Sequence, residues 1–362
     1  MYFRVIFVTK SMTEGKPLKL ILQFAVPLLL GNLLQQMYNL VDAAIVGRVL
    51  GTGALAAVGA TSSVQFLVLG FCIGICIGFG IPIAKSFGAE RLDKMRSYIF
   101  NSVLLTALFA VLITAVCSLC CTLILQMLSV PQDVFDDAYA YLIVIFLGIP
   151  FTLLYNLLSS ILRSVGDSRT PFLFLAISTV LNIGLDLLCI IVFKWGVAGA
   201  AIATVISQIA SCVIGFAYMH RKYTLLRFSL RELRLDVKTA GRILHVGAPM
   251  AIQQSIVSCG FLFLQRLVNL YGESMIASYT VATRMENILM IPIIGIQNTM
   301  ATFAGQNMGA RQPERVSKGL GQGVLVSLFM TAALCVCQLL GMELIIRAFK
   351  LDAAAAAICR QH

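Results

Sequence analysis

The chain has 362 residues, of which 59% are hydrophobic and only 12% are charged. Soluble proteins carry roughly 25% charged residues, so this composition excludes a water-soluble globule of this size. The net charge of +11 does not indicate nucleic-acid binding, because Lys and Arg gather in the short connections between apolar runs. We therefore expect an all-α integral membrane protein that has the lipid bilayer as its solvent and no nucleic-acid partner.

Nine apolar segments are long enough to cross a bilayer, which requires about 20 residues per helix. In chain order they are residues 20–41, 54–84, 99–127, 138–162, 172–193, 197–219, 243–268, 276–304 and 324–346. The second and the eighth are longer than one straight crossing requires, which predicts tilted or kinked helices. The sequence therefore predicts about nine transmembrane helices.

The charges between these segments indicate the orientation of the chain. If the segments alternate in direction and residues 1–19 lie inside, most Lys and Arg residues fall on the cytoplasmic side, while the outer connection 129–137 has three aspartates and neither Lys nor Arg. By the positive-inside rule, we expect a multi-pass protein of the cell membrane with a cytoplasmic N-terminus, which starts at Met1 or at Met12. The basic, partly amphipathic connection 220–242 is expected to form a linker helix on the cytoplasmic surface of the membrane.

Two parts of the chain resemble each other. Residues 24–27 (FAVP) recur as residues 245–249 (HVGAP), and residues 87–94 (FGAERLDK) recur as residues 308–315 (MGARQPER). An even number of membrane segments separates the two copies, so both enter the membrane in the same direction. Parallel repeats of this kind are typical of transporters. We expect a two-lobe fold with a six-helix lobe at 20–219, a cytoplasmic linker at 220–242 and an incomplete second lobe of three helices at 243–362.

Two membrane segments carry polar stripes that include a carboxylate. The first stripe consists of Asn32, Gln35, Asn39 and Asp42, and the stripe on the fifth segment consists of Ser178, Asn182 and Asp186. Spacings of three or four residues place each set on one face of a helix. Ionisable groups inside a membrane are costly and are usually functional, and a buried carboxylate can take up a proton or exchange it for a cation. We therefore predict that Asp42 and Asp186 form a coupling site.

The second half of the chain and the cysteines give fewer indications of a functional site. Glu286, on the eighth segment, is either a second coupling carboxylate or one member of a structural ion pair. Most of the eleven cysteines lie inside apolar runs without an accompanying histidine, where they behave as small hydrophobic residues. We therefore expect neither a metal site nor a cofactor, with a proton or a sodium ion as the coupling ion.

Four motifs resemble those of the multidrug and toxic compound extrusion transporters. They are residues 38–47 (YNLVDAAIVG), 163–171 (RSVGDSRTP), 182–186 (NIGLD) and 196–204 (GVAGAAIAT), and the resemblance runs from about residue 14 over essentially the whole chain. It implies two six-helix lobes and export of cationic or amphipathic drugs and toxins, driven by protons or sodium. It also implies a cation site in the first lobe, which by position consists of Asp42, Asn182, Asp186 and Thr204. Further candidates for coupling or substrate binding are Gln35, Asn39 and either Tyr139 or Tyr141.

The chain departs from this family pattern in two places. Some branches carry a glutamate in the seventh helix eight residues after its proline, and Val257 holds that position here, which argues against coupling through the seventh helix. The family has twelve helices, whereas this sequence provides nine. We therefore expect a transporter that is truncated at its C-terminus and is inactive alone, or is completed by a part supplied elsewhere. Polar groups of its second lobe, such as Ser258 and Thr283, would then face lipid or an open cavity.

Three other functions were compared with transport of cations. A flippase for lipid-linked precursors needs a cavity rich in Arg and Lys to hold pyrophosphate, whereas the stripes here are acidic and neutral. A membrane-embedded prenyltransferase needs clustered aspartates for Mg²⁺, and the aspartate cluster lies in the outer connection 129–137. A channel needs pore-lining rings, and the two-lobe repeat favours a transporter. The prediction is therefore a monomeric antiporter for small organic cations, not an enzyme, with the flippase as the alternative.

Overall fold

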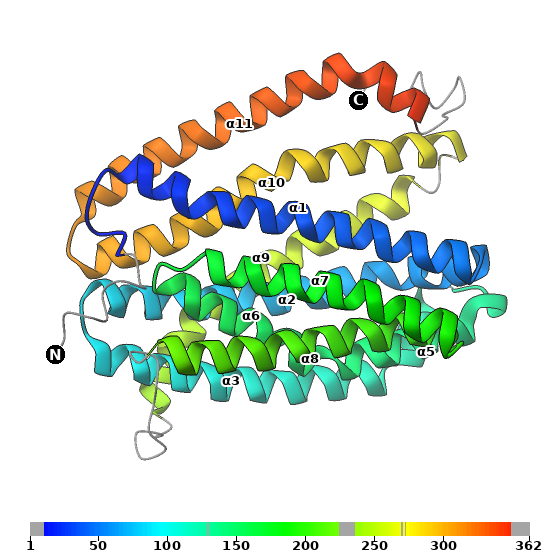
Figure 1. The fold of residues 1–362 in the computed structure, drawn as a ribbon, viewed down its shortest axis with the longest axis horizontal. Coiled ribbons are helices and arrows are strands. Elements are labelled where there is room, and N and C mark those ends of the chain that lie inside the picture. Colours follow the sequence, from blue (N-terminus) through cyan, green and yellow to red (C-terminus); the bar gives the residue numbers. More distant parts are fainter. Residues whose placement is uncertain (1–10, 129, 224–235, 269–270, 272, 349–362) are drawn as a thin grey trace.

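The computed structural model describes residues 11–128, 130–223, 236–268, 271 and 273–348, and the regular elements of this part of the chain are all helices. They are α1 (Pro17–Val49), α2 (Thr52–Gly88), α3 (Leu92–Leu119), α4 (Cys121–Met127), α5 (Gln132–Leu147), α6 (Ile149–Ser164), α7 (Arg169–Leu187), the π-helix η1 (Leu188–Val192), α8 (Gly196–Lys222), α9 (Val237–Val268), α10 (Glu273–Gly309) and α11 (Pro313–Ala348). The long helices lie side by side along the long axis of the molecule (Figure 1).

The structure agrees with the nine predicted membrane segments. In the described part of the chain eight helices are long and apolar enough to span a bilayer, and α5 and α6, which meet at an angle of 45°, make nine when the pair is counted as one span. The bend lies at Gly148, directly before Pro150, which stands in the first turn of α6. A proline has no N–H to continue the hydrogen bonds of α5, so the fourth segment is broken at this point.

Two further spans are interrupted where the sequence showed only continuous apolar runs. The third predicted segment is divided at Cys120 into α3 and α4. The fifth segment ends in η1, which begins two residues after Asp186. Single π-turns inside α-helices occur frequently at functional sites, and this one directly follows a predicted site residue.

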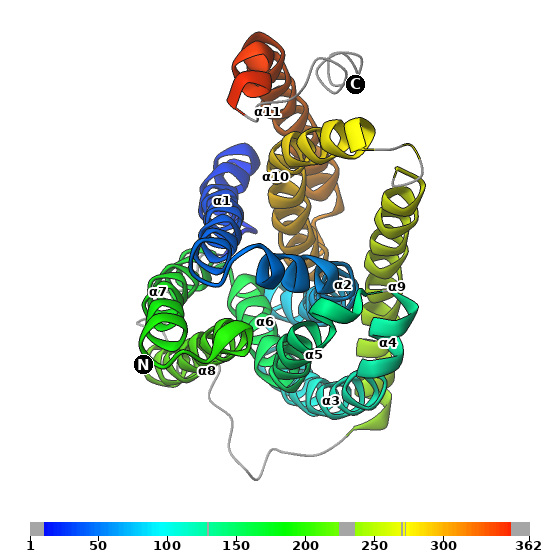
Figure 2. The same cartoon turned by 90° about the vertical axis from the view of Figure 1, so that its right-hand side faces the viewer.

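Helix α2 is the centre of the assembly. It packs against α3, α5 and α6 of the first lobe and against α9 and α10 of the second lobe, and it lies between these helices in the view along the bundle (Figure 2). Helix α1 packs on α7 on one side and on α10 and α11 on the other. Its apolar side chains Ile21, Phe24 and Leu28 form a core with Ile296 of α10 and Phe303 of α10, so α1 touches both lobes.

The turns after α2 and α10 have the same backbone geometry, as the sequence repeat predicts. Glu90 and Arg311 hold equivalent positions in these turns, and both have left-handed φ angles, of 56° and 59°. The N–H groups of residues 89, 90 and 91 bond to the carbonyls of residues 85, 87 and 86, and those of 310, 311 and 312 bond to the carbonyls of 306, 308 and 307. The two copies therefore end their second helix in the same way.

These two turns also touch each other in a reciprocal manner. A Cβ atom on Gly88 would lie 2.0 Å from the backbone oxygen of Gln306, and a Cβ atom on Gly309 would lie 2.0 Å from the backbone oxygen of Lys85. Lys85 and Gln306 are equivalent in the repeat, as are the two glycines. We call this pair of contacts the glycine crossing. It places a pseudo-two-fold axis between α2 and α10, parallel to the helices, as expected for parallel repeats.

The start of the chain closes the same end of the bundle, at the left of Figure 1. The N–H of Met12 donates to the side-chain oxygen of Gln306 at 2.8 Å, and the amide nitrogen of Gln306 donates to the carbonyl of Ser164 at 2.8 Å. Asn307 donates to the carbonyl of Met12 at 3.2 Å. Gln306 therefore links the chain start, the first lobe and the second lobe at the glycine crossing.

One sequence expectation is wrong for Ser258, which faces neither lipid nor an open cavity. Its side chain is fully buried and lies against Gly70 of α2, where an added Cβ would be 2.9 Å from the Ser258 hydroxyl. Because Gly70 has no side chain, α9 approaches α2 closely enough for α2 to cover Ser258. Of the predicted linker 220–242, residues 220–222 end α8 and residues 237–242 begin α9, while residues 224–235 lie outside the described residues.

Candidate cation-coupling site

The site is built on α1 and α7, which pack against each other. Tyr38 and Asp42 on α1, and Asn182 and Asp186 on α7, are each four residues apart, so each pair lies on one face of its helix. Helix α8 covers α7 and adds Thr204. Asp186 and Asn182 are fully buried or nearly so, with exposed fractions of 0% and 1%. Asp42, Tyr38 and Thr204 are half-buried. Two carboxylates and three neutral polar groups therefore lie between three helices.

The carboxyl groups of Asp42 and Asp186 lie close enough to each other to share a hydrogen bond. Two ionised carboxylates in contact repel each other, and burial from water increases the cost of the charge. A hydrogen bond between them requires a proton on one of the two. In addition, one oxygen atom of each carboxyl group is buried without a hydrogen-bond partner. A proton or a metal cation would therefore stabilise the pair, and each carboxyl group has an oxygen atom free to bind it.

Asn182 joins this pair to α8. With its amide oriented so that both atoms are satisfied, Asn182 donates to Asp186 at 2.9 Å and accepts from the backbone N–H of Thr204 at 3.2 Å. The hydroxyl groups of Thr204 and Tyr38 are 3.1 Å apart and share a hydrogen bond. These bonds fix the positions of the oxygen atoms around the carboxylates, as a binding site for a small cation requires.

Of the two tyrosines that the sequence left open, Tyr141 is the one near the site. Its side chain is 5% exposed, lies within electrostatic reach of Asp42 and Asp186, and is hydrogen-bonded to Gln65 of α2. Tyr139, two residues earlier on α5, is 38% exposed, because residues two apart point to different sides of a helix.

The remaining predicted candidates are outside this cluster. Gln35 and Asn39 are exposed and bond to each other at 3.4 Å. Glu286 is half-buried on α10, where its electrostatic neighbour among the described residues is Tyr279. Sequence reasoning did not select Tyr38 or Gln65 as site residues. The position of Tyr38, one helical turn before Asp42, was the available signal for the first of them.

The MatE family profile matches residues 27–188 and 249–361 of this chain. Among curated proteins, the chain is 32% identical over 304 residues to a protein of Bacillus subtilis named "Probable multidrug resistance protein YpnP". The match covers 84% of this chain and 68% of that relative. It is also 32% identical over 320 residues to "Probable multidrug resistance protein YoeA" of the same organism, covering 86% of this chain and 69% of the relative.

Solved structures show the same fold. The chain superposes with a TM-score of 0.90 and 24% identity on a structure described as the "outward-facing conformation of a multidrug resistance MATE family transporter", covering 98% of this chain and 80% of that one. A structure described as "MATE in the bent conformation" gives a TM-score of 0.88 at 25% identity, covering 96% and 78%. Profile, relatives and fold agree, so this chain is a multi-pass membrane protein that belongs to the MatE family of multidrug efflux transporters.

Proposed function

We propose that this chain is a secondary active antiporter that exports cationic or amphipathic compounds in exchange for protons or sodium ions. The observation that carries the proposal is the contact between the Asp42 and Asp186 carboxyl groups inside the bundle. An acidic pair without a basic partner attracts cations, and ionisable groups at membrane depth are usually part of an ion or substrate path. The neutral polar groups of Asn182, Thr204 and Tyr38 complete the proposed site.

The exchange follows from competition at this pair. When a proton or sodium ion occupies the site, the negative charge is neutralised and the cationic substrate is released. When that ion leaves, the charge is restored and the substrate binds again. Both events happen between α1 and α7, and α1 also packs on α10 and α11. A change in the α1–α7 contact therefore alters the contact between the lobes, as alternating access requires.

The oxygen atoms of Asp42, Asp186, Asn182 and Thr204 suit either coupling ion. Hard cations prefer oxygen ligands, and these residues provide carboxylate, amide and hydroxyl oxygens. A proton needs the carboxyl pair alone. We further propose that the chain functions as a monomer in the cell membrane with its N-terminus in the cytoplasm. In this orientation the glycine crossing lies on the cytoplasmic side, and the acidic connection 129–137 lies outside.

Efflux from vesicles tests the proposal directly. Purified protein is reconstituted, a fluorescent organic cation is enclosed, and a proton gradient and a sodium gradient are imposed in separate experiments. Export driven by one gradient, and its loss in Asp186→Asn, are the expected results and identify the coupling ion. Export by this chain alone would also mean that its nine predicted helices suffice, against the expectation that a truncated chain is inactive. Export that needs neither gradient, or that both carboxylate variants retain in full, would contradict the antiport mechanism.

A further inference from the structure

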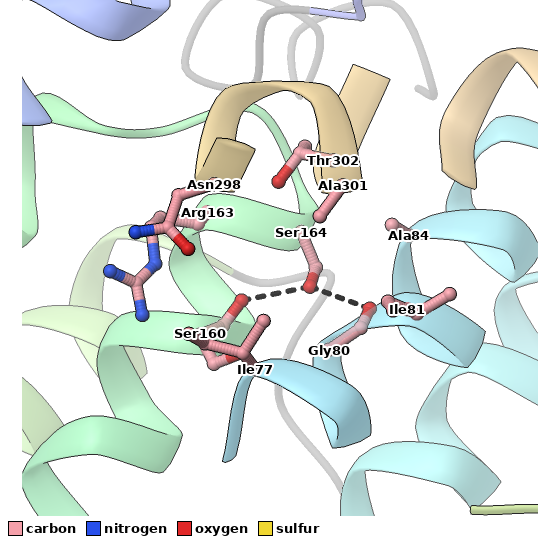
Figure 3. A pocket seen from close by; sticks show the side chains of 10 residues that line it. All are labelled: Ile77, Gly80, Ile81, Ala84, Ser160, Arg163, Ser164, Asn298, Ala301 and Thr302. Atoms are coloured by element: carbon pink, nitrogen blue, oxygen red, sulfur yellow. Dashed lines mark hydrogen bonds between the residues drawn. The ribbon is translucent and has the colours of Figure 1, made fainter. Parts of the chain in front are cut away.

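A small cavity lies between the two lobes, apart from the carboxylate site. It is lined by α2 and α6 of the first lobe and by α10 of the second lobe, and its volume is about 20 Å³. Its polar lining consists of Ser160, Arg163 and Ser164 from α6 and of Asn298 and Thr302 from α10. In Figure 3 the guanidinium group of Arg163 lies beside the amide of Asn298, so the two lobes meet at this arginine.

Arg163 has no acidic partner among the residues that the structure describes. The nearest acid along the chain is Asp167, and its carboxylate is already in use. It accepts hydrogen bonds from the N–H groups of Arg169 and Thr170, both at 3.0 Å, and from the hydroxyl of Tyr223. Arg163 lies in the last turn of α6, and a charge held between packed helices is costly unless it is paired, so Arg163 leaves a positive charge uncompensated at the lobe interface.

The other polar groups around the cavity can donate hydrogen bonds to the same ligand. A guanidinium group has five N–H donors and no acceptor, and amide and hydroxyl side chains also donate. Asn298 and Thr302 bring such donors from the second lobe. Ser164 is excluded as a donor to the ligand, because its hydroxyl already donates to the carbonyls of Gly80 and Ser160, both at 2.8 Å and both in the first lobe. The cavity therefore combines one positive charge with neutral donors, which is the chemistry of an anion site.

The size of the cavity selects the type of anion. A volume of about 20 Å³ holds roughly one water-sized particle, so a monatomic ion fits. We propose that this inter-lobe cavity binds a single inorganic anion such as chloride, with Arg163 as its cationic ligand and Asn298 as a donor from the opposite lobe. The site is distinct from the Asp42–Asp186 pair and does not depend on the proposed antiport.

Binding at this place has a conformational consequence. The cavity is complete only while α10 is held against α2 and α6, and it lies next to the contact between Gln306 and Ser164 that joins the lobes at 2.8 Å. A ligand stabilises the conformation that binds it. The anion therefore stabilises the arrangement in which the lobes are closed at the glycine crossing, and its release accompanies their separation.

Thermal unfolding of the purified full chain tests the site in the absence of transport. Chloride is titrated against gluconate at constant ionic strength, so that only the identity of the anion changes. We expect a saturable rise in melting temperature of roughly 3–5 °C for the wild type. Arg163→Gln should lose this rise and Asn298→Ala should require several-fold more chloride, while Arg169→Gln, an exposed arginine in the next turn, should behave as the wild type.

Further measurements separate the alternatives. Equal melting temperatures in chloride and gluconate, or a full chloride effect in Arg163→Gln, would refute the proposal. Stabilisation by acetate or phosphate through Arg163, without stabilisation by chloride, would assign the cavity to an anionic group of a transported compound instead. If Arg163→Gln does not fold, crystals of the wild type in bromide decide the question by anomalous scattering. A bromide peak beside Arg163 supports the site, and a cavity without one contradicts it.

Discussion

At the scale of single residues, the function depends on how the charges of two carboxyl groups are balanced. Asp42 and Asp186 touch each other, Asp186 has no exposed surface, and no lysine or arginine occurs on the stripe of either helix. The remaining polar contacts, from Asn182, Thr204 and Tyr38, are neutral. A cation at this pair therefore changes the local charge without competition from a fixed basic group.

The first prediction concerns these carboxylates. We expect Asp42→Asn and Asp186→Asn each to reduce gradient-driven export to background, because an amide neither repels the other carboxylate nor binds a proton. The double variant should be no worse than either single variant, since residues that act as a unit have non-additive effects. Export is measured in vesicles, with Asp136→Asn, an exposed aspartate, as the control. Normal export by both single variants would show that coupling occurs elsewhere.

The second prediction concerns the hydroxyl of Thr204. Thr204→Val keeps the shape of the side chain and removes the hydrogen bond to Tyr38. A hydrogen bond contributes about 1 kcal/mol, so the affinity for the coupling ion should fall by roughly fivefold. The affinity is obtained from the ion concentration that gives half-maximal export. Thr179→Val is the matched control, because its hydroxyl donates to the carbonyl of Leu175 in its own helix, and an equal loss in both variants would exclude a specific role.

At the scale of helices, α1 and α2 carry the connections between the lobes. Helix α1 packs on α7, α10 and α11, and α2 packs on helices of both lobes. Hydropathy predicted where these helices occur, because long apolar runs in a membrane form helices. It did not predict the break at Gly148, the π-turn after Asp186 or the partners of each helix, because these depend on contacts between distant segments.

The third prediction concerns the glycine crossing. Gly88→Ala places a methyl group where the backbone of Gln306 lies, so the two helices must move apart. We expect a loss of stability of about 1–3 kcal/mol and a lower melting temperature of the purified protein. Gly53→Ala, in the first turn of α2 with no atom within 4 Å of the added Cβ, should be neutral or stabilising, because alanine favours helices by about 1 kcal/mol over glycine. Equal melting temperatures for the two variants would contradict the close approach.

At the scale of the whole molecule, two lobes meet along α2 and α10 at one end of the bundle. The sequence predicted the two-lobe class from the repeated motifs, and the equivalent turns at Glu90 and Arg311 confirm it. It predicted Asp42 and Asp186 from helical spacing, but their contact could not be deduced, since spacing says nothing about which stripes face each other. Gln65 and the cavity at Arg163 emerged only from the packing of several helices.

The fourth prediction concerns orientation in the membrane. In a cysteine-free background, Asp133→Cys should react with an impermeant thiol reagent added to intact cells, whereas Lys94→Cys should react only after the cells are opened. Both positions are exposed and lie in the first turn of their helices, α5 and α3, and the positive-inside rule assigns them to opposite sides. Labelling of position 94 from outside would reverse the proposed topology.

The glycine crossing has the geometry of a contact in a symmetric homodimer, although it is formed within one chain. In such an interface, residue i of the first subunit contacts residue j of the second, and residue j of the first contacts residue i of the second. One substitution in the shared sequence therefore changes two contacts at once. Here the halves are covalently joined, and the equivalent positions differ: Lys85 corresponds to Gln306 and Glu90 to Arg311, while both halves have a glycine at the crossing. Within one chain the side chains around the axis need not be identical in the two halves, whereas the close backbone contact leaves no room for a side chain on either glycine.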